Sequence, residues 1–215
     1  MNIAGRVGLI ALIAGLSGCA STPIHYHTLV SPSSVTSTRL PPAPFLIDVM
    51  AVGVPVQIDQ PQWVVRLGAN SVGVLEGERW GAPLSDELRS ALSAELTQRL
   101  NTQDTSGLTP SSDKPVLRIK VQVRRFDSWP GRQVELYANW SLSFADDAPP
   151  GHLICEGQFR EDAPGSYVQL ATAQQRVVTT MGTRIADDAR KWWLSRSTGC
   201  TCLSKPVSSA PCCPP

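Results

Sequence analysis

The chain has 215 residues, of which 42% are hydrophobic and 17% charged, and its formal net charge is +1. This composition is typical of a globular protein with one domain of about 150 residues plus tails, whose core needs no metal or disulfide. A nearly neutral chain lacks the basic surface that binding to nucleic acid backbones requires, so we expect no nucleic-acid partner.

The first nineteen residues indicate export and lipidation. Arg6 supplies a positive start, and Val7–Leu16 is an apolar run too short to span a bilayer comfortably. The sequence Leu16-Ser17-Gly18-Cys19 then fits the bacterial lipobox, in which the cysteine thiol receives a diacylglyceryl group. We therefore predict a signal peptide over residues 1–18 and acylation of Cys19. The alternative is an ordinary secretory signal with an incidental cysteine.

The destination of the lipoprotein is predicted from the residue after Cys19. Ala20 stands there instead of the aspartate that retains lipoproteins at the inner membrane of enteric bacteria. By this general analogy we expect an outer-membrane anchor, with the protein facing the periplasm. The acyl chains themselves hold the anchor, since each buried CH₂ contributes about 0.8 kcal/mol.

Residues 19–44 are rich in Ser, Thr and Pro and are predicted to be a lipid-anchored tether. Within it, Tyr26–Val30 is a possible short strand. His25 and His27 have the spacing of metal ligands on an extended chain, but two imidazoles alone rarely hold a metal. We therefore expect a solvated pair of histidines.

The domain proper is predicted over residues 45–196 and begins with an apolar strand over 45–52. Pro55 and Pro61 then prevent a continuous helix or central strand. Gln62–Leu67 and Val72–Leu75 are predicted to form a hairpin around the intervening turn residues.

Two helices and three further strands complete the predicted domain. Leucines recur every fourth residue from Leu84 to Leu100, which indicates an amphipathic helix over residues 83–101. Strands over 117–124, 134–144 and 153–160 alternate apolar and polar residues, and a second amphipathic helix follows over 167–195, with Trp192 and Trp193 expected to plug the sheet edge. The predicted fold class is α/β (α+β): one mainly antiparallel sheet with both helices on one face and a polar opposite face.

A dense motif lies between residues 54 and 84, and it resembles the PqiC/YmbA family of auxiliary lipoproteins. The matching residues are Pro55, Ile58, Asp59, Pro61, Gln62, Val64, Arg66, Asn70, Arg79, Trp80, Pro83 and Leu84. The resemblance extends over about residues 26–193. It implies a non-catalytic accessory subunit of an ABC-type intermembrane transport system for lipids or hydrophobic molecules. An MCE-domain tunnel protein, a permease and an ATPase would be separate partner chains, and a homo-oligomer is possible.

The motif residues Asp59, Pro61, Gln62, Arg66, Arg79, Trp80 and Pro83 are candidates for either partner docking or scaffolding. As scaffold, Asp59 would accept hydrogen bonds from its own loop, and Arg66 would pair with Glu76 or Glu78. As a docking surface, the rigid proline loop, Trp63 and Trp80 would present anchors to a partner, since tryptophan and arginine are enriched at interface hot spots. We favour the scaffold. Arg118, Lys120 and Arg124 on the open sheet face are expected to be a solvated surface, although they could also meet an acidic partner or anionic headgroups.

We expect no catalytic residues, no cofactor and no metal site, because the chain contains none of the common catalytic or nucleotide-binding motifs. The alternatives are a carrier that holds lipid in its own cavity and, less favoured, a hydrolase using Asp146, Asp147 and His152. The tail over residues 197–215 is predicted to be disordered or disulfide-linked and contains Cys200, Cys202, Cys212 and Cys213. Cys155 is expected to be a buried core thiol.

Overall fold

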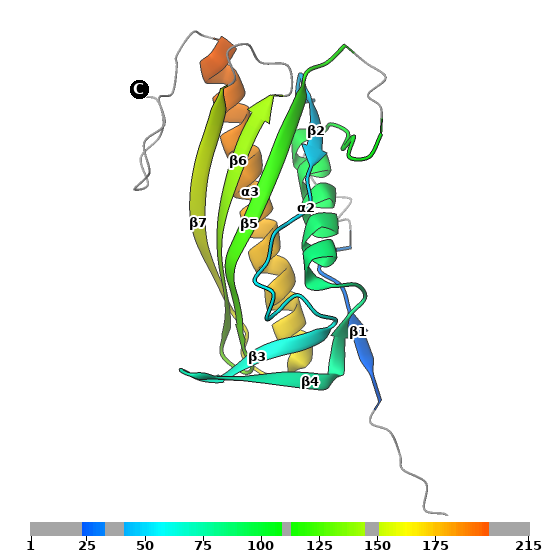
Figure 1. Cartoon of the computed structure of the whole chain (residues 1–215), viewed down its shortest axis with the longest axis vertical. Helices are drawn as coiled ribbons and strands as arrows, with labels where there is room; N and C mark the ends of the chain where they lie inside the picture. The colour runs from blue at the N-terminus through cyan, green and yellow to red at the C-terminus, as the bar shows by residue number, and fades with distance from the viewer. Residues whose placement is uncertain (1–22, 33–40, 109–112, 145–150, 198–215) are drawn as a thin grey trace, which may run out of the picture.

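The computed structural model describes residues 23–32, 41–108, 113–144 and 151–197. Within these ranges a four-stranded sheet, a three-stranded sheet and two helices share one hydrophobic core. Figure 1 shows both helices on the same side of the four-stranded sheet, with the three-stranded sheet at one end of the molecule. The predicted α+β class is confirmed, whereas the expectation of a single sheet is wrong.

The larger sheet has the order β2-β5-β6-β7 and contains the three strands with clean alternation. Its members are β2 (Leu46–Val49), β5 (Val116–Trp129), β6 (Gln133–Phe144) and β7 (His152–Asp162). β2 is parallel to β5, and the other pairs are antiparallel. Every second side chain of β6 is buried, as expected for a sheet covered on one face only.

Two strands of this sheet differ in length from the prediction. β5 continues five residues beyond Arg124, because a bulge between Val123 and Arg125 shifts the register and returns Phe126 and Ser128 to the buried face. β2 ends earlier than predicted, and Met50, the residue after it, is 42% exposed. Beyond β2 the chain continues beside β5 through isolated backbone hydrogen bonds, from the Met50 amide to the Ile119 carbonyl and from the Gly53 amide to the Val121 carbonyl, both at 3.0 Å.

The two helices agree with the predicted periodicities. α2 (Leu84–Leu100) buries the five leucines of its four-residue stripe, and α3 (Tyr167–Ser197) packs against β6, β7 and α2. Gly182 lies at the contact between the helices, where a Cβ atom would come within 2.7 Å of the Glu95 side chain. Glycine at this position thus permits the close approach of the helices. No helix in the described part of the chain has both the length and the apolar composition to cross a membrane.

Aromatic side chains pack at the end of β6 and α3, an end of the larger sheet that Figure 1 shows to be remote from the three-stranded sheet. The Trp192 ring stacks on Phe144 with centroids 5.4 Å apart, and Trp193 packs on Phe45 at 5.5 Å. The two tryptophans therefore cover the end of β6 and the chain before β2, in place of the predicted position at a sheet edge.

The three-stranded sheet has the order β1-β4-β3. β3 (Gln62–Gly68) and β4 (Ser71–Trp80) form the predicted hairpin, although β4 is longer than expected. β1 (His25–His27) lies parallel to β4 within the segment predicted as tether. The hairpin thus pairs with the N-terminal segment instead of joining the larger sheet.

The polar loop that follows α2, around residues 103–106, covers the free edge of β2. Backbone hydrogen bonds link Ile47 to this loop, including one of 2.8 Å from the Thr105 amide. The Asp104 carboxylate accepts hydrogen bonds from the hydroxyls of Ser93 and Ser106. Partial burial alone would raise the pKa of Asp104, but the hydrogen bonds from Ser106, Ser93 and the backbone outweigh it and hold the pKa below 3.8. The ionised carboxylate therefore joins the loop to the sheet and to α2.

Candidate functional site

The candidate site is the junction between the three-stranded sheet and the start of α2, where the motif residues meet. α2 begins after Pro83, whose side chain makes no capping hydrogen bond. The Asp59 carboxylate supplies the cap from a distant loop, since its Oδ1 accepts a hydrogen bond of 3.0 Å from the Ser85 amide. Asp59 therefore fixes the helix start, and the prediction that it bonds within its own loop is wrong.

Two pairs of motif residues close the base of the hairpin. The Trp80 amide donates a hydrogen bond of 2.7 Å to the Pro61 carbonyl, and Gln62 pairs with Arg79 across the strands. The register shifts directly after Gln62, which places extra residues of β4 opposite one step of β3. This irregularity lets β4 bend towards α2 after its pairing with β3.

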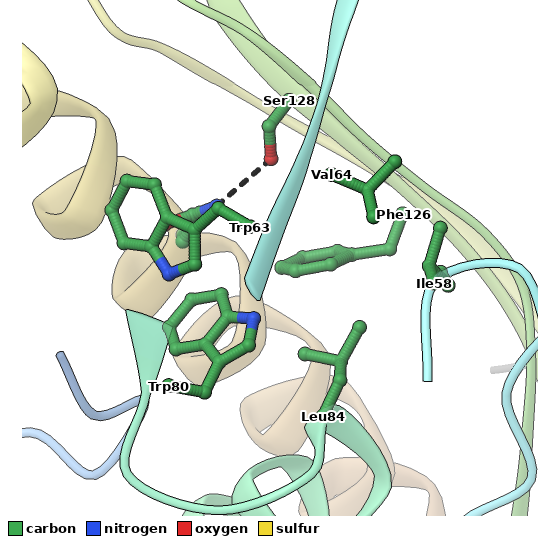
Figure 2. Close-up of a pocket in the computed structure, with 8 residues that line it drawn as sticks. Ile58, Trp63, Val64, Trp80, Leu84, Phe126 and Ser128 are labelled. Carbon is green, nitrogen blue, oxygen red and sulfur yellow. Dashed lines mark hydrogen bonds between the residues drawn. The ribbon is translucent and has the colours of Figure 1, made fainter. Parts of the chain in front are cut away.

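Two tryptophans of this stretch, Trp63 and the motif residue Trp80, are buried inside the junction. Trp63 is 1% exposed and Trp80 4%, and their ring centroids lie 5.0 Å apart. Figure 2 shows the two rings beside Leu84 and Phe126, which come from α2 and β5. The Trp63 ring also lies 4.3 Å from the His27 ring. These tryptophans consequently contribute packing within the molecule and present little surface to a partner.

The pocket between these side chains has room for about one water molecule. On one side, Gln174 of α3 donates a hydrogen bond of 2.9 Å to the Ser128 hydroxyl (Figure 2). A space of this size cannot hold an acyl chain. The pocket at the junction therefore gives no support to the alternative of a lipid carrier.

A buried carboxylate on α2 fastens the N-terminal segment to the helix. Glu87 is 7% exposed and accepts hydrogen bonds from the Thr28 hydroxyl at 2.8 Å and from the Leu29 amide at 2.9 Å. Leu29 itself belongs to the hydrophobic core. The chain after β1 is thus held both by apolar contact and by a charged acceptor.

A second carboxylate, Glu78, binds both histidines of β1. Its two oxygens lie 3.1 Å from His25 Nδ1 and 2.6 Å from His27 Nε2. The expectation of a solvated pair is wrong for His27, whose side chain is 17% exposed and packs on Trp63. The i, i+2 spacing places both imidazoles on one side of an extended strand, where they face Glu78.

The motif arginines also make contacts within the molecule. Arg66 Nε donates to Asp127 Oδ1 on β5 at 2.8 Å, which joins the two sheets. The predicted partners Glu76 and Glu78 are wrong: Arg79 contacts Glu76, at 3.2 Å to the carbonyl and 3.6 Å to the carboxylate. Asp127, the actual partner of Arg66, lies beyond the bulge of β5, in a stretch for which no strand was predicted.

The open face of the larger sheet is polar, as predicted. Arg118 lies 3.9 Å from the Asp48 carboxylate, and Arg124 donates to the Asn139 side chain at 3.0 Å. Lys120 is exposed between them. Two of the three predicted surface cations therefore have neighbours on adjacent strands.

Several predicted sites lie outside the described residues, namely Cys19, the four tail cysteines, Asp146 and Asp147. His152, the remaining member of the suggested hydrolase group, is exposed. Across the described ranges, no three His, Cys, Asp or Glu side chains are grouped closely enough to hold a metal ion. Cys155 packs against the hydrophobic core, as expected, but it is half-buried instead of fully buried.

Comparison with known proteins assigns the chain to a family. The family described as the ABC-type transport auxiliary lipoprotein component matches residues 27–186. The chain belongs to this family. A search of curated protein sequences gave no match.

Solved structures show that the fold of this family member is shared. A crystal structure of an uncharacterized protein has a TM-score of 0.60 at 17% identity and covers 78% of this chain and 99% of its own. A crystal structure of a Xanthomonas campestris protein of the DUF330 family has a TM-score of 0.59 at 18% identity, with coverage of 81% and 99%. At these identities the likeness concerns the fold.

Sequence reasoning missed the two carboxylates that hold the N-terminal segment of this auxiliary component. Glu87 stands three residues after Leu84 and directly before Leu88, so it lies on the buried stripe of α2. A charged residue on an apolar stripe needs a partner, and that signal was available in the sequence. Glu78, in contrast, belongs to a run of polar residues and gives no comparable signal.

Proposed function

We propose that this chain is a non-catalytic accessory subunit of an MCE-linked ABC-type intermembrane transport system. Its acylated Cys19 would anchor it in the outer membrane, with the folded domain in the periplasm. The observation that carries the proposal is the family match over residues 27–186, to which the lipobox at Cys19 adds the anchor. The MCE tunnel protein, the permease and the ATPase would be separate chains.

The proposed role of the motif is to build a rigid scaffold. Asp59 caps α2, Arg66 joins the sheets, and Trp80 packs in the core. With these side chains occupied internally, the family motif would act on a partner indirectly, by fixing the shape of the junction. The same proposal gives the chain no catalytic role. The motif side chains would serve the structure of the domain and not a reaction.

Anchoring is tested by labelling the native bacterium with radioactive palmitate and then separating inner and outer membranes. The expected result is a labelled protein in the outer-membrane fraction and loss of the label in the variant Cys19→Ala. A labelled protein confined to the inner membrane would contradict the predicted destination. An unlabelled protein would contradict lipidation itself.

Partnership is tested by isolating the tagged, acylated protein after cross-linking and identifying the co-isolated chains by mass spectrometry. An MCE-domain protein and a permease are the expected partners. The variant Trp80→Ala should lose stability and partner together, whereas loss of the partner with an unchanged melting temperature would make the motif an interface. Copurified lipid, bound in equimolar amount to the folded domain, would instead favour a carrier.

A further inference from the structure

The end of the molecule that contains the three-stranded sheet exposes a group of large apolar side chains. They come from β1 and the residue before it, from the tip of the β3–β4 hairpin at the other end of β4, and from the start of α3, and Figure 1 shows all three elements at this end of the molecule. We call the group the basal patch. Its members are each between 45% and 68% exposed: Ile24, Tyr26, Leu67, Val72, Val74 and Val168.

The strand registers explain why the β1 and β4 members project away from the core. Val74 alternates along β4 with Gly73 and Leu75, and these two pair with the buried residues Val65 and Trp63. Tyr26 stands between two histidines that both contact Glu78, so its ring lies on the opposite side of β1. The exposure of these side chains is thus fixed by backbone pairing.

Chain length places this patch near the proposed membrane anchor. Pro23, where the described structure begins, follows Cys19 by four residue steps, and even a fully extended chain spans at most about 14 Å over that distance. If Cys19 is acylated, as proposed above, the start of β1 lies within that distance of the lipid headgroups. The end of the molecule that bears the basal patch must then lie next to the bilayer.

The chemistry of this end suits a lipid surface. Tyr26 combines an apolar ring with a hydroxyl group, the combination that is enriched at membrane interfaces. The arginines at this end contact carboxylates within the protein, since Arg66 and Arg125 share Asp127 and Arg79 lies near Glu76. Attachment of this end would therefore depend chiefly on apolar burial, and anionic lipid would add little.

We infer that the basal patch is a membrane-contact surface, which rests on the lipid-anchored bilayer beside the acyl chains of Cys19. The acyl chains and the patch would form two attachments at neighbouring points. Together they would orient the domain upright, with the aromatic end around Trp192 directed away from the membrane. This inference rests on the proposed acylation and adds an orientation to it.

Photocrosslinking of the full, acylated chain tests the inference. The photoreactive amino acid benzoylphenylalanine replaces Tyr26 in one variant and Val74 in a second, so that misfolding of either leaves one usable probe. The matched control replaces Ile154, which is 54% exposed near the start of β7, in the part of the sheet close to Phe144. Each protein is placed in phosphatidylcholine vesicles, with and without phosphatidylglycerol, and palmitate labelling verifies the anchor separately.

The expected result is a lipid adduct at Tyr26 and at Val74, none at Ile154, and the same yield with and without phosphatidylglycerol. Protein adducts in place of lipid adducts would show that a second copy or a partner covers the patch, and would overturn the inference. Equal lipid adducts at all three positions, or none at all, would overturn it too. A chain without palmitate would refute the proposed anchor, which is a distinguishable failure.

Discussion

The cap that Asp59 provides to α2 gives the sharpest test of the scaffold. In Asp59→Ala, the Ser85 amide loses its acceptor at 3.0 Å, and the helix start loses a negative charge. Loss of a cap costs about 0.5–2 kcal/mol, and because Asp59 is exposed we expect the lower half of that range, about 0.5–1 kcal/mol. In Asp59→Asn the acceptor is kept, so only the interaction with the helix dipole is lost, about 0.3 kcal/mol.

Urea unfolding at neutral pH measures both variants, and the expected order of stability is wild type, Asn, Ala. For a domain of this size, 1 kcal/mol corresponds to a melting-temperature shift of about 2–4 °C. Asp86→Ala is the matched control, since it removes a first-turn charge from the same helix and leaves the Asp59 hydrogen bond in place. If Asp59→Ala unfolds at the same urea concentration as the wild type, the capping argument is refuted. A simultaneous loss of partner binding would then make Asp59 a contact residue.

Two further predictions concern the other polar links. The contact between Arg66 and Asp127 should give a coupling free energy of about 0.5–1 kcal/mol in a double-mutant cycle with alanine. The exposed contact of Arg79 with Glu76 is the control and should give almost none. Equal coupling free energies for the two contacts would argue against a link between the sheets. The pKa of Asp104 is lowered in the folded state, so its contribution to stability is present above the unfolded value of 3.8 and is lost as the pH falls through the folded value. The free energy of unfolding of Asp104→Asn should therefore lie below that of the wild type at neutral pH and approach it in acid. Urea titrations at several pH values measure both proteins. A difference that does not depend on pH would contradict the stabilising role of the Asp104 carboxylate.

The sequence was most informative where one element repeats a simple period. Alternation in β6 and the four-residue leucine spacing in α2 each reflect burial on a single face, which acts locally on every residue of the element. The helix bounds and the hairpin turn followed from the same local rules. Lipidation remains a prediction, since Cys19 lies outside the described residues.

Contacts between distant segments could not be predicted in this way. β1 has three residues, too few to show a period, and it becomes a strand because β4 offers it an edge. Arg66 contacts Asp127, which lies beyond the bulge in β5, and this bulge has no distinct sequence signal. The second sheet was missed because the possible short strand over residues 26–30 gave no sign that it would pair with the hairpin.

The parallel pairing of β1 with β4 determines how the domain would respond to a pull on its N-terminus. A force along the strand axis loads all three backbone pairs in shear at once, so that they cannot open one after another. The next restraint along the chain is Glu87 in the first turn of α2, whose carboxylate accepts hydrogen bonds from Thr28 and Leu29. Tension from a moving membrane would thus reach the helix before the four-stranded sheet, and it would be borne first by this short strand, by Glu87 and by the buried Leu29.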